Sequence, residues 1–176
     1  MISSERPTIR PARHDDADAV VALADALSVH TEEPTGNFTP EAMRSAVFDD
    51  PRVRMLVAEI GGKVVGYAMF HDSYDTANAA RGLYLNDIIV EESVRGDGVA
   101  RALMAGVMRA AKNQGDVFVW WTAKPTNARA LAFYKKLGAI NVPAVTHAIF
   151  GPPFDTLAQE ASDYLPPEGE GGSAKR

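Results

Sequence analysis

The chain has 176 residues, of which 46% are hydrophobic and 23% charged, proportions typical of a folded globular domain. It has no cysteine, which excludes disulfides, thiolate zinc sites and a cysteine nucleophile and agrees with a reducing cytoplasm. The net charge of −5 gives no sign of a nucleic-acid footprint and favours small cationic partners. No apolar run approaches the roughly 20 residues that span a bilayer. Residues 1–16 hold no signal-peptide-like stretch, so neither membrane insertion nor export is expected.

The N-terminal part of the chain predicts one strand and two helices. Residues 8–9 belong to a short strand candidate, and residues 14–27 place apolar side chains close to helical spacing. Asp15 and Asp16 precede the apolar positions of this segment, where carboxylates cap free N–H groups and favour the positive end of the helix dipole. A second helix is predicted over residues 40–50, with a proline at its first position.

Three strand-like runs follow. Residues 54–60 and 63–72 are rich in β-formers and flank the pair Gly61-Gly62, which is a hairpin signal. A third run covers residues 82–90. We interpret the polar stretch of residues 73–82 that precedes it as a loop.

The rest of the chain alternates helices and strands. The pattern predicts helices over residues 98–115 and 127–139, and strands over residues 117–123 and 144–150. This element order, with no break in composition, predicts one α/β domain around a mixed sheet.

The stretch VRGDGVARAL, residues 94–103, joins a strand to a helix through two glycines. Such a turn directs several backbone N–H groups and the positive end of the helix dipole at one point, which suits a phosphate group. Gly96 and Gly98 leave room for a ligand, and Ala100 keeps the first helical turn narrow. The same glycines also fit a tight connection that needs only positive φ angles. The stretch is neither a Walker loop nor the dinucleotide fingerprint, because the Gly-Lys-Ser/Thr and the third glycine are missing.

Two motifs together resemble the GNAT superfamily of N-acetyltransferases. The stretch from Arg95 to Ala100 matches its Gln/Arg-x-x-Gly-x-Gly/Ala pyrophosphate loop. Residues 127–139 resemble its later Asn-x-x-Ala-x-x-Phe-Tyr-x-x-x-Gly-Ala segment, one helix and one strand further on, as in that superfamily. The resemblance implies an α/β GNAT acyltransferase fold, with a mixed, mostly antiparallel sheet splayed at the acetyl-CoA site and flanked by helices. We therefore expect one N-acetyltransferase domain over residues 1–165 and a disordered tail over residues 166–176.

Within the superfamily, the chain is most similar to the spermidine/spermine (diamine) branch. The similarity lies in residues 56–76, 82–104 and 135–151. That branch carries Glu-Asp where this chain has Asn86-Asp87, so one carboxylate beside the substrate amine is missing. Members of the branch are commonly dimers, and the resemblance implies a homodimer here.

The resemblance also assigns the donor site. The strand before the loop would pair its backbone with the pantetheine arm of acetyl-CoA and offer an N–H to the oxyanion, which points to Ile88, Ile89 and Val90. Asn127 would cap its helix and lie near the pantetheine. The expected pyrophosphate-binding residues are Arg95, Gly96, Asp97, Gly98, Val99, Ala100 and Arg101.

Tyr134 matches the superfamily's tyrosine that protonates the departing CoA thiolate. A phenol suits this task, because its ordinary pKa of about 10 leaves it protonated at neutral pH. From the helical pattern alone, Tyr134 would be a core aromatic residue on an amphipathic helix.

The acceptor side has several candidates. Glu32 and Glu33 occupy the loop that faces the acceptor in the diamine branch, and two solvated charges before a proline are the alternative. Trp120 to Thr122 fall where diamine acetyltransferases contact substrate. Because strand neighbours face opposite sides, one of Trp120 and Trp121 should be in the core.

Asn86 and Asp87 complete the acceptor set. Asp87 is either the local base, directly or through a water chain, or a residue that orients the backbone. His71 and Asp72 end a strand near the acceptor side, where a surface turn is the simpler interpretation. None of the four histidines pairs with another ligand at i, i+4, so no metal site is expected.

These patterns predict an acetyl-CoA-dependent N-acetyltransferase that acts on a primary amine by direct attack on the thioester. The acceptor would be a small molecule, either diamine- or polyamine-like or an amino-acid side chain. Two alternatives remain open: a peptide or protein N-acetyltransferase, and a GNAT module that binds acyl-CoA without turnover. We expect a cytoplasmic homodimer with no nucleic-acid or membrane partner.

Overall fold

The computed structural model describes residues 5–32, 34–50, 52–161 and 164. The chain forms two compact units, Met1–Leu137 and Gly138–Arg176. None of the described helices is long and apolar enough to cross a bilayer.

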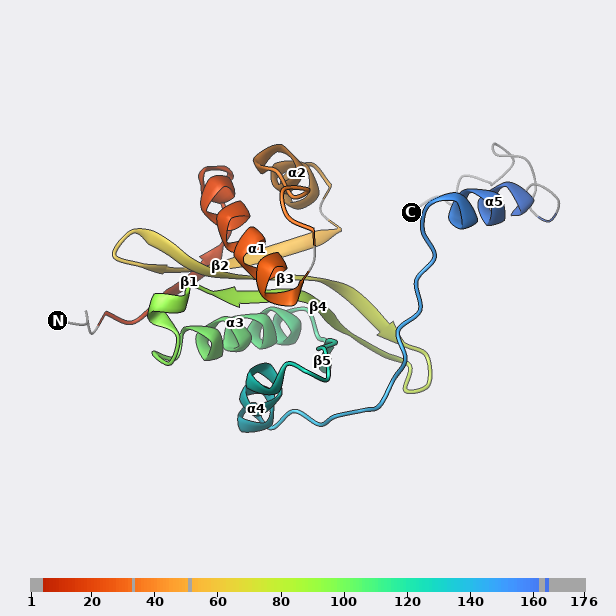
Figure 1. Ribbon diagram of the computed structural model, residues 1–176. Helices are drawn as coiled ribbons and strands as arrows, with labels where there is room; N and C mark the ends of the chain where they lie inside the picture. The colour runs from red at the N-terminus through yellow and green to blue at the C-terminus, as the bar shows by residue number, and fades with distance from the viewer. Residues whose placement is uncertain (1–4, 33, 51, 162–163, 165–176) are drawn as a thin grey trace. The chain divides into compact units, whose positions relative to one another are not determined.

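A five-stranded sheet in the order β1-β2-β3-β4-β5 lies at the centre of the first unit (Figure 1). Its strands are β1 (Thr8–Pro11), β2 (Val53–Ile60), β3 (Lys63–Asp75), β4 (Ala80–Val90) and β5 (Phe118–Trp120). The first four strands pair antiparallel, and β5 runs parallel to β4. The mixed, mostly antiparallel sheet expected from the sequence is therefore confirmed.

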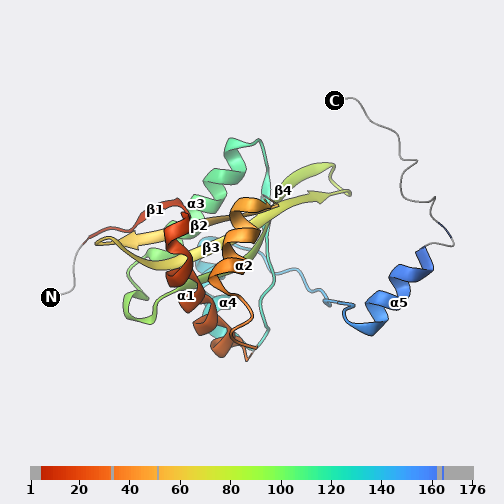
Figure 2. The same cartoon turned by 90° about the horizontal axis from the view of Figure 1, so that it is seen from above.

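Helices cover both faces of this sheet (Figures 1 and 2). On one face lie α1 (Ala17–Thr31) and α2 (Pro40–Arg44), and α2 continues into a π-helical turn, Ser45–Asp49. On the other face lie α3 (Val99–Asn113) and α4 (Ala128–Leu137).

The alternation of side chains along β3 produces two apolar layers. Tyr67 faces α1 and α2, whereas its neighbour Ala68 and then Phe70 face α3. The layer under α1 and α2 is built mainly by Val20, Met43, Met55, Val57, Tyr67 and Ile89. The layer under α3 is built mainly by Phe70, Leu83, Leu85, Leu103, Met104 and Val107.

The loop predicted over residues 73–82 is wrong. β3 continues to Asp75 and β4 begins at Ala80, so the two strands form a long hairpin that projects beyond α1 and α2 (Figures 1 and 2). The Asp75 carboxylate closes the turn by accepting the N–H of Ala77 at 2.9 Å. Polar residues fit these strands because the projecting hairpin is exposed on one face and only half-buried on the other.

The strand predicted over residues 144–150 is also wrong, because the structure assigns no strand there. An alternating pattern becomes a strand only where a neighbouring strand pairs with it. The second unit instead contains a helix that the pattern did not predict, α5 (Pro152–Glu160). Its signal was present in Gly151 followed by prolines in the first turn. The tail predicted over residues 166–176 lies outside the described residues.

Asp16 does not cap α1 through its side chain, contrary to expectation. Its carboxylate accepts the backbone N–H of Arg13 at 2.6 Å and two guanidinium N–H groups of Arg10 at 2.7 and 2.9 Å. The Arg10 guanidinium holds the pKa of Asp16 below its usual value. Arg10 also donates to Glu59 at 2.6 Å, so its guanidinium on β1 links β2 to the buried carboxylate of Asp16 at the start of α1.

Candidate active site

The turn between β4 and α3 has the backbone form that its glycines suggested. Gly96 and Gly98 have φ angles of 100° and 85°, in the region that residues with a Cβ rarely adopt. A Cβ built at either position would meet no atom within 4 Å. The glycines are therefore required by the backbone conformation, and the space beside them is open.

The first turn of α3 presents backbone donors at this opening. The N–H of Ala102 donates to Gly98 O at 2.9 Å, so the N–H groups of Val99, Ala100 and Arg101 precede the first α-helical hydrogen bond. The side chain of Val99 is buried in the core and that of Arg101 is exposed. Positive φ glycines, helix-start N–H groups that precede the first α-helical hydrogen bond, and open space together fit a pyrophosphate.

The side chain of Arg95 makes contacts within the chain beside the loop. Its Nε donates to the carbonyl oxygen of Val90 at 3.0 Å, and its Nη1 lies 3.7 Å from Glu92. The side chain thus fastens the loop to the end of β4. Asp97 is exposed, and its N–H donates to Val94 O at 3.4 Å.

β4 and β5 diverge beside this loop. They pair only over Gly82–Tyr84 and Phe118–Trp120. Beyond that point Ile88, Ile89 and Val90 pair with β3 alone among the described strands. Among the described residues, no strand pairs with their outer backbone edge, so an extended chain could add alongside it.

Tyr134 lies on α4, and its ring centroid is 5.0 Å from that of Trp121 in an edge-to-face arrangement. Burial raises the pKa of Tyr134 above its ordinary value of 10.0, so its phenol stays protonated at neutral pH. Asn127 caps the same helix, because its Oδ1 accepts the N–H of Ala130 at 3.1 Å. The expected cap is thus confirmed.

β4 carries a bulge next to the point of divergence. Met69 pairs with Asp87 and Phe70 with Leu85, which leaves Asn86 without a cross-strand partner. The extra residue turns the side chains of both Asn86 and Asp87 toward the sheet face covered by α1.

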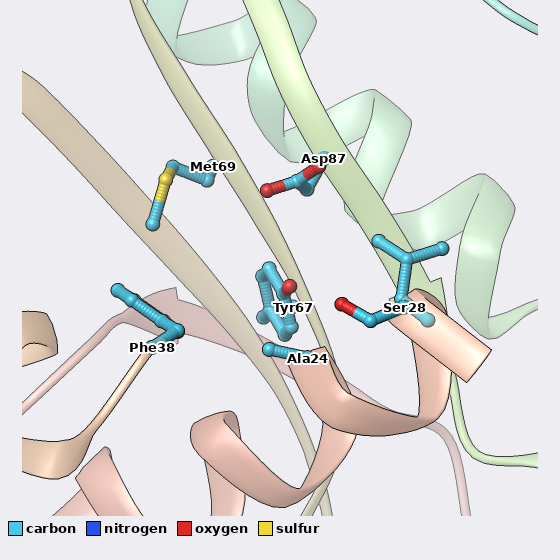
Figure 3. Close-up of a pocket in the computed structure, with 7 residues that line it drawn as sticks. Ala24, Ser28, Phe38, Tyr67, Met69 and Asp87 are labelled. Carbon is cyan, nitrogen blue, oxygen red and sulfur yellow. The ribbon is translucent and has the colours of Figure 1, made fainter. Parts of the chain in front are cut away.

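A cavity of about 260 Å³ lies on that face (Figure 3). Figure 3 shows the Asp87 carboxylate, the Tyr67 hydroxyl and the Ser28 hydroxyl around one space. Burial and the nearby charge of Asp87 raise the pKa of Tyr67, so this phenol is neutral. Asp87 is the only carboxylate among the lining residues. The complete lining is Ala24, Leu27, Ser28, Phe38, Tyr67, Met69 and Asp87.

A row of aromatic side chains continues the cavity's face of the sheet. His71, Tyr84 and Trp120 are direct cross-strand neighbours on β3, β4 and β5. Their ring centroids are 5.3 Å apart for His71 and Tyr84 and 5.0 Å apart for Tyr84 and Trp120. The Tyr84 hydroxyl lies 3.1 Å from Thr122 Oγ1. Two predicted acceptor residues, Trp120 and Thr122, therefore belong to one cluster.

The two tryptophans separate as the strand alternation predicted. Trp120 is 51% exposed and its Nε1 donates to Ser73 Oγ at 3.0 Å, whereas Trp121 packs against the α3 layer. Glu32 is an exposed residue in the left-handed conformation at the end of α1, and it does not line the described cavity. Glu33 lies outside the described residues.

His71 was interpreted as part of a surface turn, and that interpretation is wrong. It lies within β3, half-buried, with Nδ1 2.9 Å from Asn86 Oδ1. The missed signal is its parity, because His71 alternates in step with Tyr67 and Met69 of the cavity. Among the described residues, no three His, Asp or Glu side chains are grouped to hold a metal ion.

Comparison with known proteins identifies this arrangement. The model of the acetyltransferase (GNAT) family matches residues 23–139. The thialysine N-epsilon-acetyltransferase of Bos taurus is 31% identical over 141 residues, which cover 74% of this chain and 82% of the relative. The L-ornithine N5-acetyltransferase of Arabidopsis thaliana is 30% identical over 92 residues, which cover 52% of this chain and 40% of the relative.

The fold is also found among solved structures. An integron cassette protein from the mobile metagenome of V. cholerae superposes with a TM-score of 0.73 at 22% identity. The superposition covers 88% of this chain and 98% of that protein.

Proposed function

The chain belongs to the acetyltransferase (GNAT) family and is an N-acetyltransferase, and from that premise we propose that it acetylates the terminal amine of a small aminoalkyl compound with acetyl-CoA. The acceptor class is a diamine or an amino acid with an amine-bearing side chain. The observation that carries this proposal is the single carboxylate, Asp87, in a small cavity beside the divergence of β4 and β5.

The donor half of the proposal rests on backbone geometry. The opening at Gly96 and Gly98 and the first N–H groups of α3 would hold the pyrophosphate, and the free edge of Ile88, Ile89 and Val90 would hold the pantetheine arm. This arrangement directs the thioester toward the point where β5 leaves β4.

The acceptor half rests on charge and size. A cavity of about 260 Å³ with one carboxylate suits one alkylammonium group and its short chain better than a peptide. The named activities of two relatives, on thialysine and on L-ornithine, also concern amino acids that end in an amine. Asn86 leaves the acceptor face with one carboxylate fewer than the diamine branch has, which favours an amino-acid side chain over a long polyamine.

The mechanism assigns each task to a side chain of this protein. When bound, acetyl-CoA supplies the thioester whose acetyl group is transferred. Asp87 attracts and orients the ammonium end of the acceptor. The protonated phenol of Tyr134 gives its proton to the departing sulfur, which its raised pKa makes available throughout the neutral range.

A thiol-release assay with acetyl-CoA tests the proposal. The panel contains ornithine, lysine, thialysine, putrescine, spermidine, an aminoglycoside and a peptide with a free N-terminus. The expected result is turnover with the amino acids or the diamine at a kcat/KM at least about tenfold above that of the peptide. Preference for the peptide contradicts the proposed acceptor class, and acetyl-CoA binding without turnover on any amine indicates a non-catalytic module. A cytoplasmic homodimer remains a prediction.

A further inference from the structure

The acceptor amine must lose a proton before it can attack, because a primary alkylamine has an ordinary pKa of about 10.4 and arrives as an ammonium ion. We propose that His71 is the general base for this step and that Asn86 is the residue that positions it. This inference rests on the proposed function and names a catalytic residue within the same site.

The hydrogen bond between the two side chains fixes the tautomer of the imidazole. Asn86 Oδ1 can only accept, so the His71 Nδ1 at 2.9 Å carries a hydrogen and donates it. In a neutral ring the other nitrogen, Nε2, then holds the free lone pair. The pair therefore presents a base of fixed orientation.

The pair lies where the reaction must take place. Asn86 is the extra residue of the β4 bulge, two residues beyond Tyr84, where the pairing with β5 ends. The free edge of β4 begins where its pairing with β5 ends, so a pantetheine arm paired with that edge would place its thioester there. On the neighbouring strand, His71 follows Tyr67 and Met69 on the cavity's face, so it stands between the cavity and the point of divergence.

Packing and strand pairing keep the ring of His71 in place. Tyr84 packs against the ring from β4, and Val53 is its cross-strand partner on β2. The titratable groups that β3 and β4 place on the same face are Tyr84 itself and, in the cavity, Tyr67 and Asp87.

The proton balance is complete with two residues. The ammonium group gives one proton to His71 Nε2, and the freed lone pair forms the C–N bond as the C–S bond breaks. The departing sulfur takes the phenolic proton of Tyr134, and Tyr134 recovers a proton from the second N–H that the nitrogen loses. His71 then releases its proton to water, so one ammonium and one thioester give one amide, one thiol and one proton.

Steady-state kinetics of His71→Gln against the wild type test the inference, with ornithine or whichever amine the wild type prefers. The expected result is a fall in kcat of about 10²-fold with an unchanged acetyl-CoA affinity. The acceptor arrives as ammonium and His71 must be neutral to accept its proton, so log kcat/KM of the wild type should rise with a slope near one at acid pH and then level off. In His71→Gln the rate should not level off, because only the free amine then reacts and its fraction keeps rising toward its pKa of about 10.4. Added imidazole should restore part of the rate in His71→Ala.

Three further measurements make the test decisive. Asn86→Ala, which keeps the imidazole but frees it, should lose about tenfold in kcat. His14→Gln, the same exchange at a ring stacked on Phe48, is the matched control and should not change kcat. Wild-type turnover establishes the proposed function independently. If His71→Gln is folded, keeps kcat within about threefold and keeps the pH profile of the wild type, the inference is overturned and Asp87 takes the role.

Discussion

The donor and acceptor sides of the active site are built in different ways. The donor loop is continuous in the chain, from Arg95 to Arg101, and what it offers is mostly backbone: two glycines at positive φ and the free N–H groups of a helix start. The acceptor side is assembled from side chains of α1, β3, β4 and β5, which are separate segments of the chain.

This difference predicts how the two sides respond to substitution. A loop that binds acetyl-CoA through its backbone should affect acetylation of every acceptor equally, because all acceptors react with the same donor. In the proposed site, side chains on the acceptor face would contact the amine, so their effects should depend on which amine is used. Substitutions on the donor side should therefore be acceptor-independent, and those on the acceptor side should be acceptor-selective.

In the proposed mechanism Tyr134 serves both sides, so Tyr134→Phe should have the largest effect. Loss of the hydroxyl removes an interaction made in the transition state and should lower kcat and kcat/KM together by about 10²-fold for every amine. Because burial raises the pKa of Tyr134, the wild-type rate should not fall from loss of its proton until the pH exceeds 10. Thiol-release kinetics from pH 7 to 10 check both statements. A kcat within about twofold of wild type, when chemistry limits turnover, would make Tyr134 a packing residue.

Asp87→Asn should have the second largest effect and should be acceptor-selective. The amide keeps the size of the side chain but removes the charge that faces the ammonium group in the cavity. Hydrogen bonds to charged groups contribute about 1.5–3 kcal/mol, so kcat/KM should fall by roughly 10- to 100-fold. Calorimetry with acetyl-CoA should show unchanged affinity. A loss of donor affinity instead would place Asp87 on the donor side.

The donor side could be predicted from the sequence because its signal is local. Gly96 and Gly98 have to be glycine for a backbone reason, and Asn127 caps the helix that follows it by accepting an N–H three residues away. The sheet order around the Gly61-Gly62 hairpin followed from the same kind of local signal.

The acceptor side could not be predicted to the same extent. His71 and Asn86 are 15 residues apart and meet only because a bulge shifts the register of β3 and β4. Residues 144–150 fail for a related reason, since the alternating pattern does not say whether a strand stands beside it. Pairing between distant segments is the information that a single sequence does not display.

Gly98→Asp should have the third largest effect, and one that is equal for all acceptors. It adds a negative charge at the start of α3, where the phosphates would bind, and forces a side chain onto a φ of 85°. The affinity for acetyl-CoA should fall by more than about tenfold, which corresponds to about 1.4 kcal/mol. Gly98→Ala is the matched control, because it has the same strain without the charge and meets no atom within 4 Å. Equal affinities for the two variants would mean that strain, not phosphate repulsion, causes the loss.

Asn86→Glu should have the smallest effect and sharpens the comparison most, because it adds a charge on the acceptor side alone. Asn86 is exposed and accepts a hydrogen bond from His71, and a glutamate oxygen can accept the same bond. The added charge contact lies near the surface, where such pairs contribute about 0.2–1 kcal/mol. We expect kcat/KM for a diamine to rise by up to about fivefold, with no change for a monoamine of the same chain length. The monoamine is the control, because both acceptors share the reacting amine and differ only in the second charge. A gain of equal size for both would show that position 86 acts on the base rather than on the second amine, and no gain for any diamine would place it away from the bound acceptor.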